Sequence, residues 1–385
     1  MSDSVHAYHE SLYQWIWDNL EFDVRGLKTA CGQEITVFDQ GELNSGAGPD
    51  FLRAHIRIGG IDWHGSVEIH KSERHWYDHS HHYDQNFNSV ILHVIFEQPE
   101  TEVRTENGSE PFTLNLFPYL NKKLRKLLTL KNSKSLPCGN TVRFINQKAF
   151  EEQIKNAHRE YFNYKSEEVL EYYDSSLPVS EAWRNAFIIC MYGCLGIPRN
   201  TGQMKLLASR LVLKSNSKLS ARQLSRLAAD KASSDIEWEH TGMRPASRPE
   251  VRISQAAAIH AAVLNIPFKS FLTDGADVWD KLIARINRKN RPGKSRLSIL
   301  KHTVFLPSLY LLGNLLHSRK IQKQSFEEWQ SSHQKVPSEI IKPFQKAGFE
   351  IRKELKVMGL AHQYKRYCRE NRCHKCKVFK NAIRS

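Results

Sequence analysis

The chain has 385 residues, of which 40% are hydrophobic, 25% charged and 10% aromatic. This composition is that of a globular protein and excludes a disordered or fibrous chain, and the length predicts two domains. Lys and Arg number 56 against 41 Asp and Glu, a net charge of +15 that favours a polyanionic partner, DNA or RNA first. A generally basic, solvated surface would give the same count.

The beginning of the sequence lacks the basic start and apolar core of a secretory signal, and no window approaches ~18 uninterrupted apolar residues. We therefore expect a cytoplasmic protein without a membrane partner. Seven cysteines, an odd number, argue against a disulfide framework and direct attention to thiol or metal roles.

Helical spacing of apolar residues over 11–20 predicts a short amphipathic helix, and EITVFD at 34–39 predicts a strand. The loop GELNSGAGPD at 41–50 is rich in glycine. Strict alternation then predicts two strands on either side of Gly59 and Gly60, which suit a two-residue hairpin turn. Counting from this turn predicts the facing pairs Ile58–Ile61, His55–His64, Leu52–Val67 and Phe51–Glu68.

The near-continuous apolar run at 89–97 predicts a central strand, so we expect a mixed sheet with flanking helices. Helical periodicity dominates beyond about residue 140, over 149–173, 202–213, 253–264 and 337–360. The predicted fold class is α+β, with a mixed-sheet domain at 1–137 and a mainly helical, basic domain at 138–385.

Titratable side chains gather at the end of the predicted hairpin. Eight of the 18 histidines fall between His55 and His93. Glu68 and His70 are two apart on a strand and leave the same face, near Asp50. Asp50, Glu68 and His70 form a minimal platform for a divalent cation. Alternation places Asp50 on the opposite face, so the platform requires a bulge at residues 50 and 51. The alternative is a structural hydrogen-bond network.

The motifs GPDF and VEIH resemble those of the PD-(D/E)XK nuclease superfamily. The resemblance implies a restriction-endonuclease-like core in which Asp50 and Glu68 bind magnesium or manganese. His70 occupies the position of the family's lysine, where it could serve as metal ligand or general base. Glu42 in GELN corresponds to an additional acidic residue that many such nucleases carry upstream.

The connection after the hairpin offers His79, His81, His82 and Asp84 as further ligands or phosphate contacts, provided that it folds back over the hairpin. His93, inside the apolar strand, is interpreted as a core histidine. The basic loop near residue 290 supplies the candidate phosphate contacts Lys289, Arg291, Lys294 and Arg296, although a basic loop is more often only solvated.

Cys368, Cys373 and Cys376 form a C-x4-C-x2-C motif, whose spacing allows three thiolates to reach one zinc ion or iron–sulfur cluster. Cys138 is the first choice for a fourth ligand and His374 the substitute. Three reduced thiols without a metal are the alternative. Cys190 and Cys194 lie in an apolar helix and are expected in the core.

Over nearly its whole length the chain also resembles an uncharacterised family of bacterial proteins, through GELNSGAGPDF, WHGSVEIH, LPC, RPEVRISQAA and the terminal cysteine motif. That resemblance implies a shared fold and no activity. The residues themselves favour a metal-dependent nuclease or phosphodiesterase acting on DNA or RNA. The alternatives are a non-catalytic nucleic-acid-binding protein with a cysteine-bound metal, and a metal hydrolase of a small anionic substrate.

Overall fold

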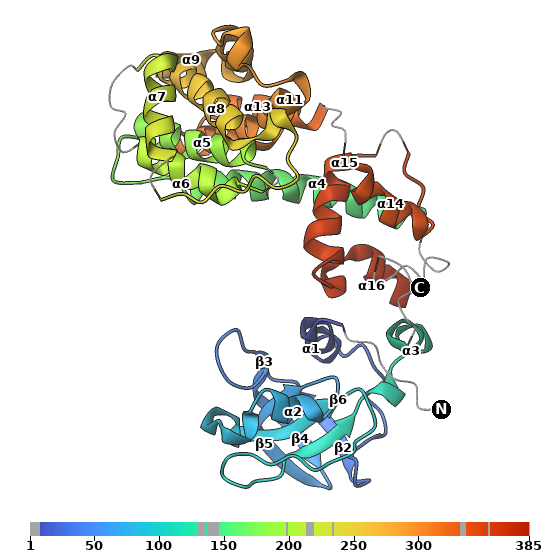
Figure 1. Cartoon of the computed structure of the whole chain (residues 1–385). Coiled ribbons are helices and arrows are strands. Elements are labelled where there is room, and N and C mark those ends of the chain that lie inside the picture. Colours follow the sequence, from blue (N-terminus) through green and yellow to red (C-terminus); the bar gives the residue numbers. More distant parts are fainter. Residues whose placement is uncertain are drawn as a thin grey trace. The chain divides into compact units, whose positions relative to one another are not determined.

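The computed structural model describes residues 8–129, 136, 146–197, 199–212, 219–232, 235–331, 336–352 and 355–384. The chain forms two compact units (Figure 1). The sheet unit comprises Met1–Ala157 and Val336–Ser385, and the helical unit comprises His158–Lys335.

One seven-stranded mixed sheet forms the middle of the sheet unit, in the order β1-β2-β4-β5-β6-β7 with β3 paired to β4. Its strands are β1 (Leu27–Lys28), β2 (Glu34–Asp39), β3 (Glu42–Leu43), β4 (Phe51–Ile58), β5 (Ile61–Ile69), β6 (Val90–Ile95) and β7 (Phe112–Asn115). The first five strands pair antiparallel, whereas β6 runs parallel to both β5 and β7. The predicted mixed sheet, with the apolar run of β6 inside it, is confirmed.

The remaining elements of the sheet unit are helical. They are α1 (Glu10–Asp18), α2 (Arg74–Asp78), η1 (His81–Tyr83), η2 (Gln85–Ser89), η3 (Phe117–Tyr119), α3 (Lys122–Thr129), α14 (Ser338–Lys346), α15 (Val357–His362), η9 (Gln363–Cys368), η10 (Cys373–Lys375) and α16 (Lys377–Arg384). Helix α4 (Gln147–Leu170) begins in the sheet unit and ends in the helical unit. Helix α1 is the helix predicted at 11–20, and its buried Leu12, Ile16 and Trp17 face the core.

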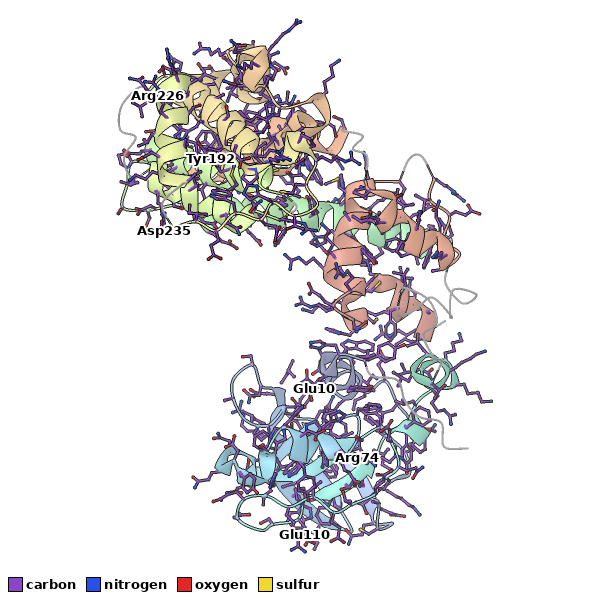
Figure 2. All side chains as sticks on the ribbon, in the orientation of Figure 1. Glu10, Arg74, Glu110, Tyr192, Arg226 and Asp235 are labelled. Atoms are coloured by element: carbon purple, nitrogen blue, oxygen red, sulfur yellow. The ribbon has the colours of Figure 1, made fainter. Side chains whose placement is uncertain are left out.

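The helical unit confirms the mainly helical texture predicted beyond the sheet. Its helices are α5 (Val179–Leu195), α6 (Thr201–Val212), α7 (Ala221–Ala232), η5 (Pro245–Ser247), α8 (Pro249–Leu264), α9 (Phe268–Thr273), η6 (Gly275–Asp277), α10 (Val278–Ala284), η7 (Arg288–Asn290), α11 (Lys294–Leu300), η8 (Lys301–Phe305), α12 (Leu306–Leu315) and α13 (Arg319–Ser331). Tyr192 on α5 is buried in this unit (Figure 2). Cys190 and Cys194 of the same helix are buried as well.

The single helical stretch predicted at 337–360 is instead two helices, α14 and α15. Helix α14 ends just before Gly348, whose φ of 95° is the left-handed conformation that stops a helix. None of the described helices is both long and apolar enough to cross a membrane.

The C-terminal residues pack with the sheet unit, and this division differs from the domains expected at 1–137 and 138–385. One hydrophobic core joins the strands and α1 to Phe344 of α14 and to Phe379 of α16. The rings of Trp15 and Phe379 meet edge to face at 6.4 Å. Burial of these apolar faces against α1 explains why the chain returns to its N-terminal unit.

Candidate metal centre

A β-bulge decides which face of the sheet Asp50 occupies. Near the turn the pairing is as predicted, with Ile58 opposite Ile61 and His55 opposite His64. Between Ala54 and Phe51 the register shifts by one, so that two residues of β4 face one residue of β5. Arg53, within the shift, has a left-handed φ of 60°.

The bulge corrects two of the predicted pairs. Phe51, not Leu52, lies opposite Val67, and the residue before it therefore comes opposite Glu68. The bulge on which the cation platform depends thus exists, but between Phe51 and Ala54 and not at 50 and 51. As a result, the backbone N–H of Asp50 donates to Glu68 Oε2 at 2.9 Å.

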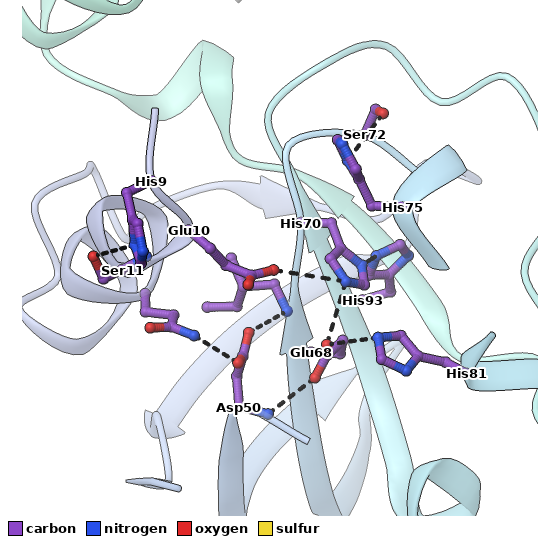
Figure 3. Close-up of polar contacts among 12 residues, drawn as sticks. His9, Glu10, Ser11, Asp50, Glu68, His70, Ser72, His75, His81 and His93 are labelled. Atoms are coloured by element: carbon purple, nitrogen blue, oxygen red, sulfur yellow. Dashed lines mark hydrogen bonds and ion pairs between the residues drawn. The ribbon is translucent and has the colours of Figure 1, made fainter. Parts of the chain in front are cut away.

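The Asp50 carboxylate is held between helix α1 and strand β5. Gln14 Nε2 of α1 donates to Asp50 Oδ1 at 2.7 Å, and the backbone N–H of Ile69 donates to Oδ2 at 3.0 Å (Figure 3). Two donors from separate elements therefore fix the orientation of this carboxylate.

Two imidazoles converge on the other oxygen of Glu68. His70 Nε2 and His81 Nε2 each lie 3.3 Å from Glu68 Oε1. Figure 3 draws both contacts as dashed lines. His70 Nδ1 is 2.9 Å from Nε2 of His93, the neighbouring strand's histidine. The Nε2 atoms of His70 and His81 are buried and have no hydrogen-bond partner within the described chain. Both nitrogens are therefore available to a cation.

His79 completes the cluster. Ligand atoms of His70, His79 and His81 all lie within 4.8 Å of one another, which is close enough for one ion. We call Glu68, His70, His79 and His81 the histidine–carboxylate centre. Glu10 of α1 borders it, with Oε1 3.8 Å from His70 Nε2 and a side chain that is 41% exposed.

Burial dominates the electrostatics of the centre. It raises the pKa of Asp50, and the nearby charge of Glu68 raises this pKa further. Burial likewise raises the pKa of Glu68. Burial and the surrounding imidazoles depress the pKa of His70, and burial lowers that of His93 to about 3. His70 and His93 are therefore neutral at pH 7, the state in which histidine binds metals, and a cation would favour the ionised carboxylates.

Other residues predicted for the centre lie elsewhere. Glu42 is on β3, exposed, and paired with Arg53, and among the described contacts none joins it to Glu68, His70 or His81. Glu10, the first residue of α1 and just outside the predicted helix, stands near the centre instead, because α1 packs against β5. His82 packs against the rings of Tyr77 and Tyr83.

The connection after β5 folds back over the hairpin and brings His81 to Glu68 and His79 to His70 and His81. Asp84 is not among these ligands; it caps the following turn by accepting from the Asn86 N–H at 2.9 Å. His93 belongs to the core, as interpreted, but also contacts His70. Its place beside β5 could have been anticipated from the apolar run of β6.

The basic loop of the helical unit is only partly open to a partner. Arg291 donates to the backbone oxygen of Ile286 at 2.7 Å, and Arg296 to that of Cys194 at 3.3 Å. Lys289 and Lys294 are exposed. Phosphate binding by these four side chains remains a prediction.

The three C-terminal cysteines lie in the sheet unit. Cys368, Cys373 and Cys376 line one pocket together with Gln363. Cys138, the predicted fourth ligand, lies outside the described residues. His374, the substitute, is buried beside α1, with Nδ1 3.4 Å from Ser11 Oγ.

Fold and site together define a mixed α/β protein with a buried cluster of histidines and carboxylates at the end of a bulged hairpin. The chain belongs to the family described as "Protein of unknown function (DUF2851)", whose sequence model matches residues 10–229. The matched range includes every residue of the histidine–carboxylate centre and ends before the C-terminal cysteines. No curated protein and no solved structure shows significant similarity to the chain.

Proposed function

We propose that the protein is a metal-dependent phosphodiesterase of the nuclease type, acting on DNA or RNA. The observation that carries this proposal is the approach of His70 Nε2 and His81 Nε2 to the same oxygen of Glu68, each at 3.3 Å. A buried carboxylate beside two imidazole nitrogens without hydrogen-bond partners costs free energy of folding unless a cation is bound there.

The donor set bears on which ion is bound. Imidazole nitrogens suit manganese, iron and zinc better than magnesium, which keeps its waters and prefers oxygen ligands. Of the two ions that the nuclease resemblance implies, Mn²⁺ therefore fits the histidine–carboxylate centre better. Such an ion, when bound, would lower the pKa of a bound water and neutralise charge on a phosphoryl oxygen.

The surrounding carboxylates have distinct positions. Asp50 is half-buried and held by two donors, so we assign it to the support or direct binding of the ion. The Glu10 side chain is 41% exposed, and its Oε1 is placed to accept a proton at the edge of the centre.

Two further features support a nuclease over another hydrolase. Asp50 and Glu68 stand at the positions of the two metal-binding acids of the PD-(D/E)XK superfamily, in GPDF and VEIH, and a restriction-endonuclease-like core is part of this proposal. His70 replaces the lysine, and we propose that it acts as a metal ligand. The net charge of +15 favours a polyanionic substrate.

The test is cleavage of single-stranded and duplex DNA and RNA by the purified full chain in Mn²⁺ or Mg²⁺. We expect cleavage in Mn²⁺ that Glu68→Gln and His81→Gln abolish. Glu42→Gln is the matched control, because it removes an acid that lies outside the centre. Salt-sensitive binding without cleavage in any metal would overturn the proposal in favour of a binding protein. Hydrolysis of small phosphoesters alone would overturn it in favour of a small-molecule hydrolase.

A further inference from the structure

The three C-terminal cysteines are brought together by a compact turn. Cys368 ends η9 and Cys373 begins η10, with Cys376 directly after it. Asn371 between them has a left-handed φ of 52°, and the backbone N–H of Cys376 donates to the oxygen of Cys373 at 2.9 Å. This turn directs all three side chains to one pocket.

A buried amide donates to two of the sulfurs. Gln363 Nε2 lies 3.7 Å from Cys368 Sγ and 3.5 Å from Cys376 Sγ. Its orientation is fixed, because Gln363 Oε1 accepts from Gln153 Nε2 at 2.8 Å, and Gln153 Oε1 in turn accepts from the backbone N–H of Lys377 at 3.0 Å. Both glutamines are almost fully buried. The amide N–H groups of Gln363 therefore point to the sulfurs and not away from them.

This network has a physical rationale if the sulfurs are thiolates. A neutral thiol sulfur is a weak acceptor, so it compensates poorly for the burial of an amide donor. A metal-bound cysteine is deprotonated, and hydrogen bonds to its sulfur are the usual support of such ligands. Apolar rings of Phe150, Phe344 and Phe379 line the same pocket, so uncompensated thiolates would be costly there.

We propose that Cys368, Cys373 and Cys376 bind a thiophilic metal centre, zinc or iron–sulfur, which is separate from the histidine–carboxylate centre. Residues 365–380 hold seven Lys or Arg against one Glu, and this charge complements the negative charge of a thiolate centre. Three cysteines within nine residues match the short spacings typical of such centres.

The centre would stabilise the contact between the C-terminal segment and α1. His374, between two of the cysteines, lies beside Ser11, and Phe379 just beyond them meets Trp15. Helix α1 also carries Glu10, which borders the histidine–carboxylate centre, and Gln14, which donates to Asp50. The cysteine-bound metal therefore positions the helix that borders the histidine–carboxylate centre.

The test measures metal content of the full chain in a Glu68→Gln background, so that the other site contributes little. The protein is purified without oxygen and reconstituted either with Zn²⁺ or with Fe²⁺ and sulfide. We expect stoichiometric metal after desalting, lost in Cys373→Ser and Cys376→Ser. Cys31→Ser is the control, since Cys31 is exposed and outside the pocket.

The identity of the bound metal follows from visible absorption, which distinguishes iron–sulfur from zinc. We also expect Gln363→Leu to accelerate metal release about 10- to 100-fold.

Two further measurements guard against variants that fail to fold. Titration of the unsubstituted chain with a mercurial should release metal in step with modification of the three cysteines. Hydrogen exchange of α1 should accelerate on that release. A reconstituted chain without metal under both conditions, an equal loss in Cys31→Ser, or a disulfide between the motif cysteines would each overturn the proposal. None of these results depends on nuclease activity.

Discussion

The hydrogen bond from Gln14 to Asp50 links helix α1 to the histidine–carboxylate centre, and its removal should weaken metal binding. Gln14→Met keeps the length and helix propensity of the side chain but removes the donor that lies 2.7 Å from Asp50 Oδ1. Hydrogen bonds to charged groups contribute about 1.5–3 kcal/mol. At about 1.4 kcal/mol for each tenfold, this corresponds to roughly 10- to 140-fold in affinity.

Because Gln14 is only half-buried and water can replace part of the bond, we expect the lower end of that range. Burial raises the pKa of Asp50 in the metal-free protein, so the bond to the ionised carboxylate is made fully only with the cation present. Calorimetric titration of metal-free protein with Mn²⁺ measures the effect. Gln40→Met, which removes an amide that instead contacts Asp18 O, is the control. Unchanged Mn²⁺ affinity in a folded Gln14→Met variant would refute the role of Asp50.

Three other outcomes are expected. Burial raises the pKa of both Asp50 and Glu68, so the folded metal-free chain holds protons that the unfolded chain has lost. In urea unfolding, their stabilising contribution should be present in full at pH values below the ordinary pKa of a carboxyl group. It should be lost as the pH rises through the raised pKa values, and Mn²⁺ should flatten this slope. Arg53→Val should lower the free energy of unfolding by about 1–2 kcal/mol, because a β-branched residue tolerates a left-handed φ poorly. Arg53→Gly should leave the free energy of unfolding nearly unchanged, since glycine adopts this φ readily. An equal loss of stability in the two variants would contradict the bulge. Glu10→Gln should weaken Mn²⁺ binding or turnover, whereas Glu42→Gln should change neither. If the Mn²⁺ titration and the cleavage assay show a loss for Glu42→Gln and none for Glu10→Gln, Glu42 and not Glu10 is the acidic residue that acts at the centre.

The sequence predicted the hairpin well where one physical signal was strong. Alternation and two glycines fixed the pairing of Ile58 with Ile61, because a slip by one residue would expose the apolar face. The same alternation predicted the wrong pairing for the residues before Ala54, because an arginine at position 53 does not indicate a left-handed conformation. That bulge had to be inferred from the chemistry, and its position was missed.

Contacts between segments that are distant in the sequence could not be predicted from local patterns either. Glu10 comes near His70 only because α1 packs against β5, and no local pattern distinguishes it from Glu42. The return of the C-terminal segment to α1, through Phe379 and Trp15, is likewise a matter of tertiary packing. Local spacing did identify the cysteine motif, whereas Gln363 and its partner Gln153 are visible only in the folded chain.

Anomalous diffraction from crystals grown in Mn²⁺ tests the central claim most directly. We predict a manganese peak bound by Glu68 Oε1, His70 Nε2 and His81 Nε2, and its disappearance in Glu68→Gln. A manganese-saturated crystal with no peak between these three atoms, or a peak that persists unchanged in that variant, would contradict the account.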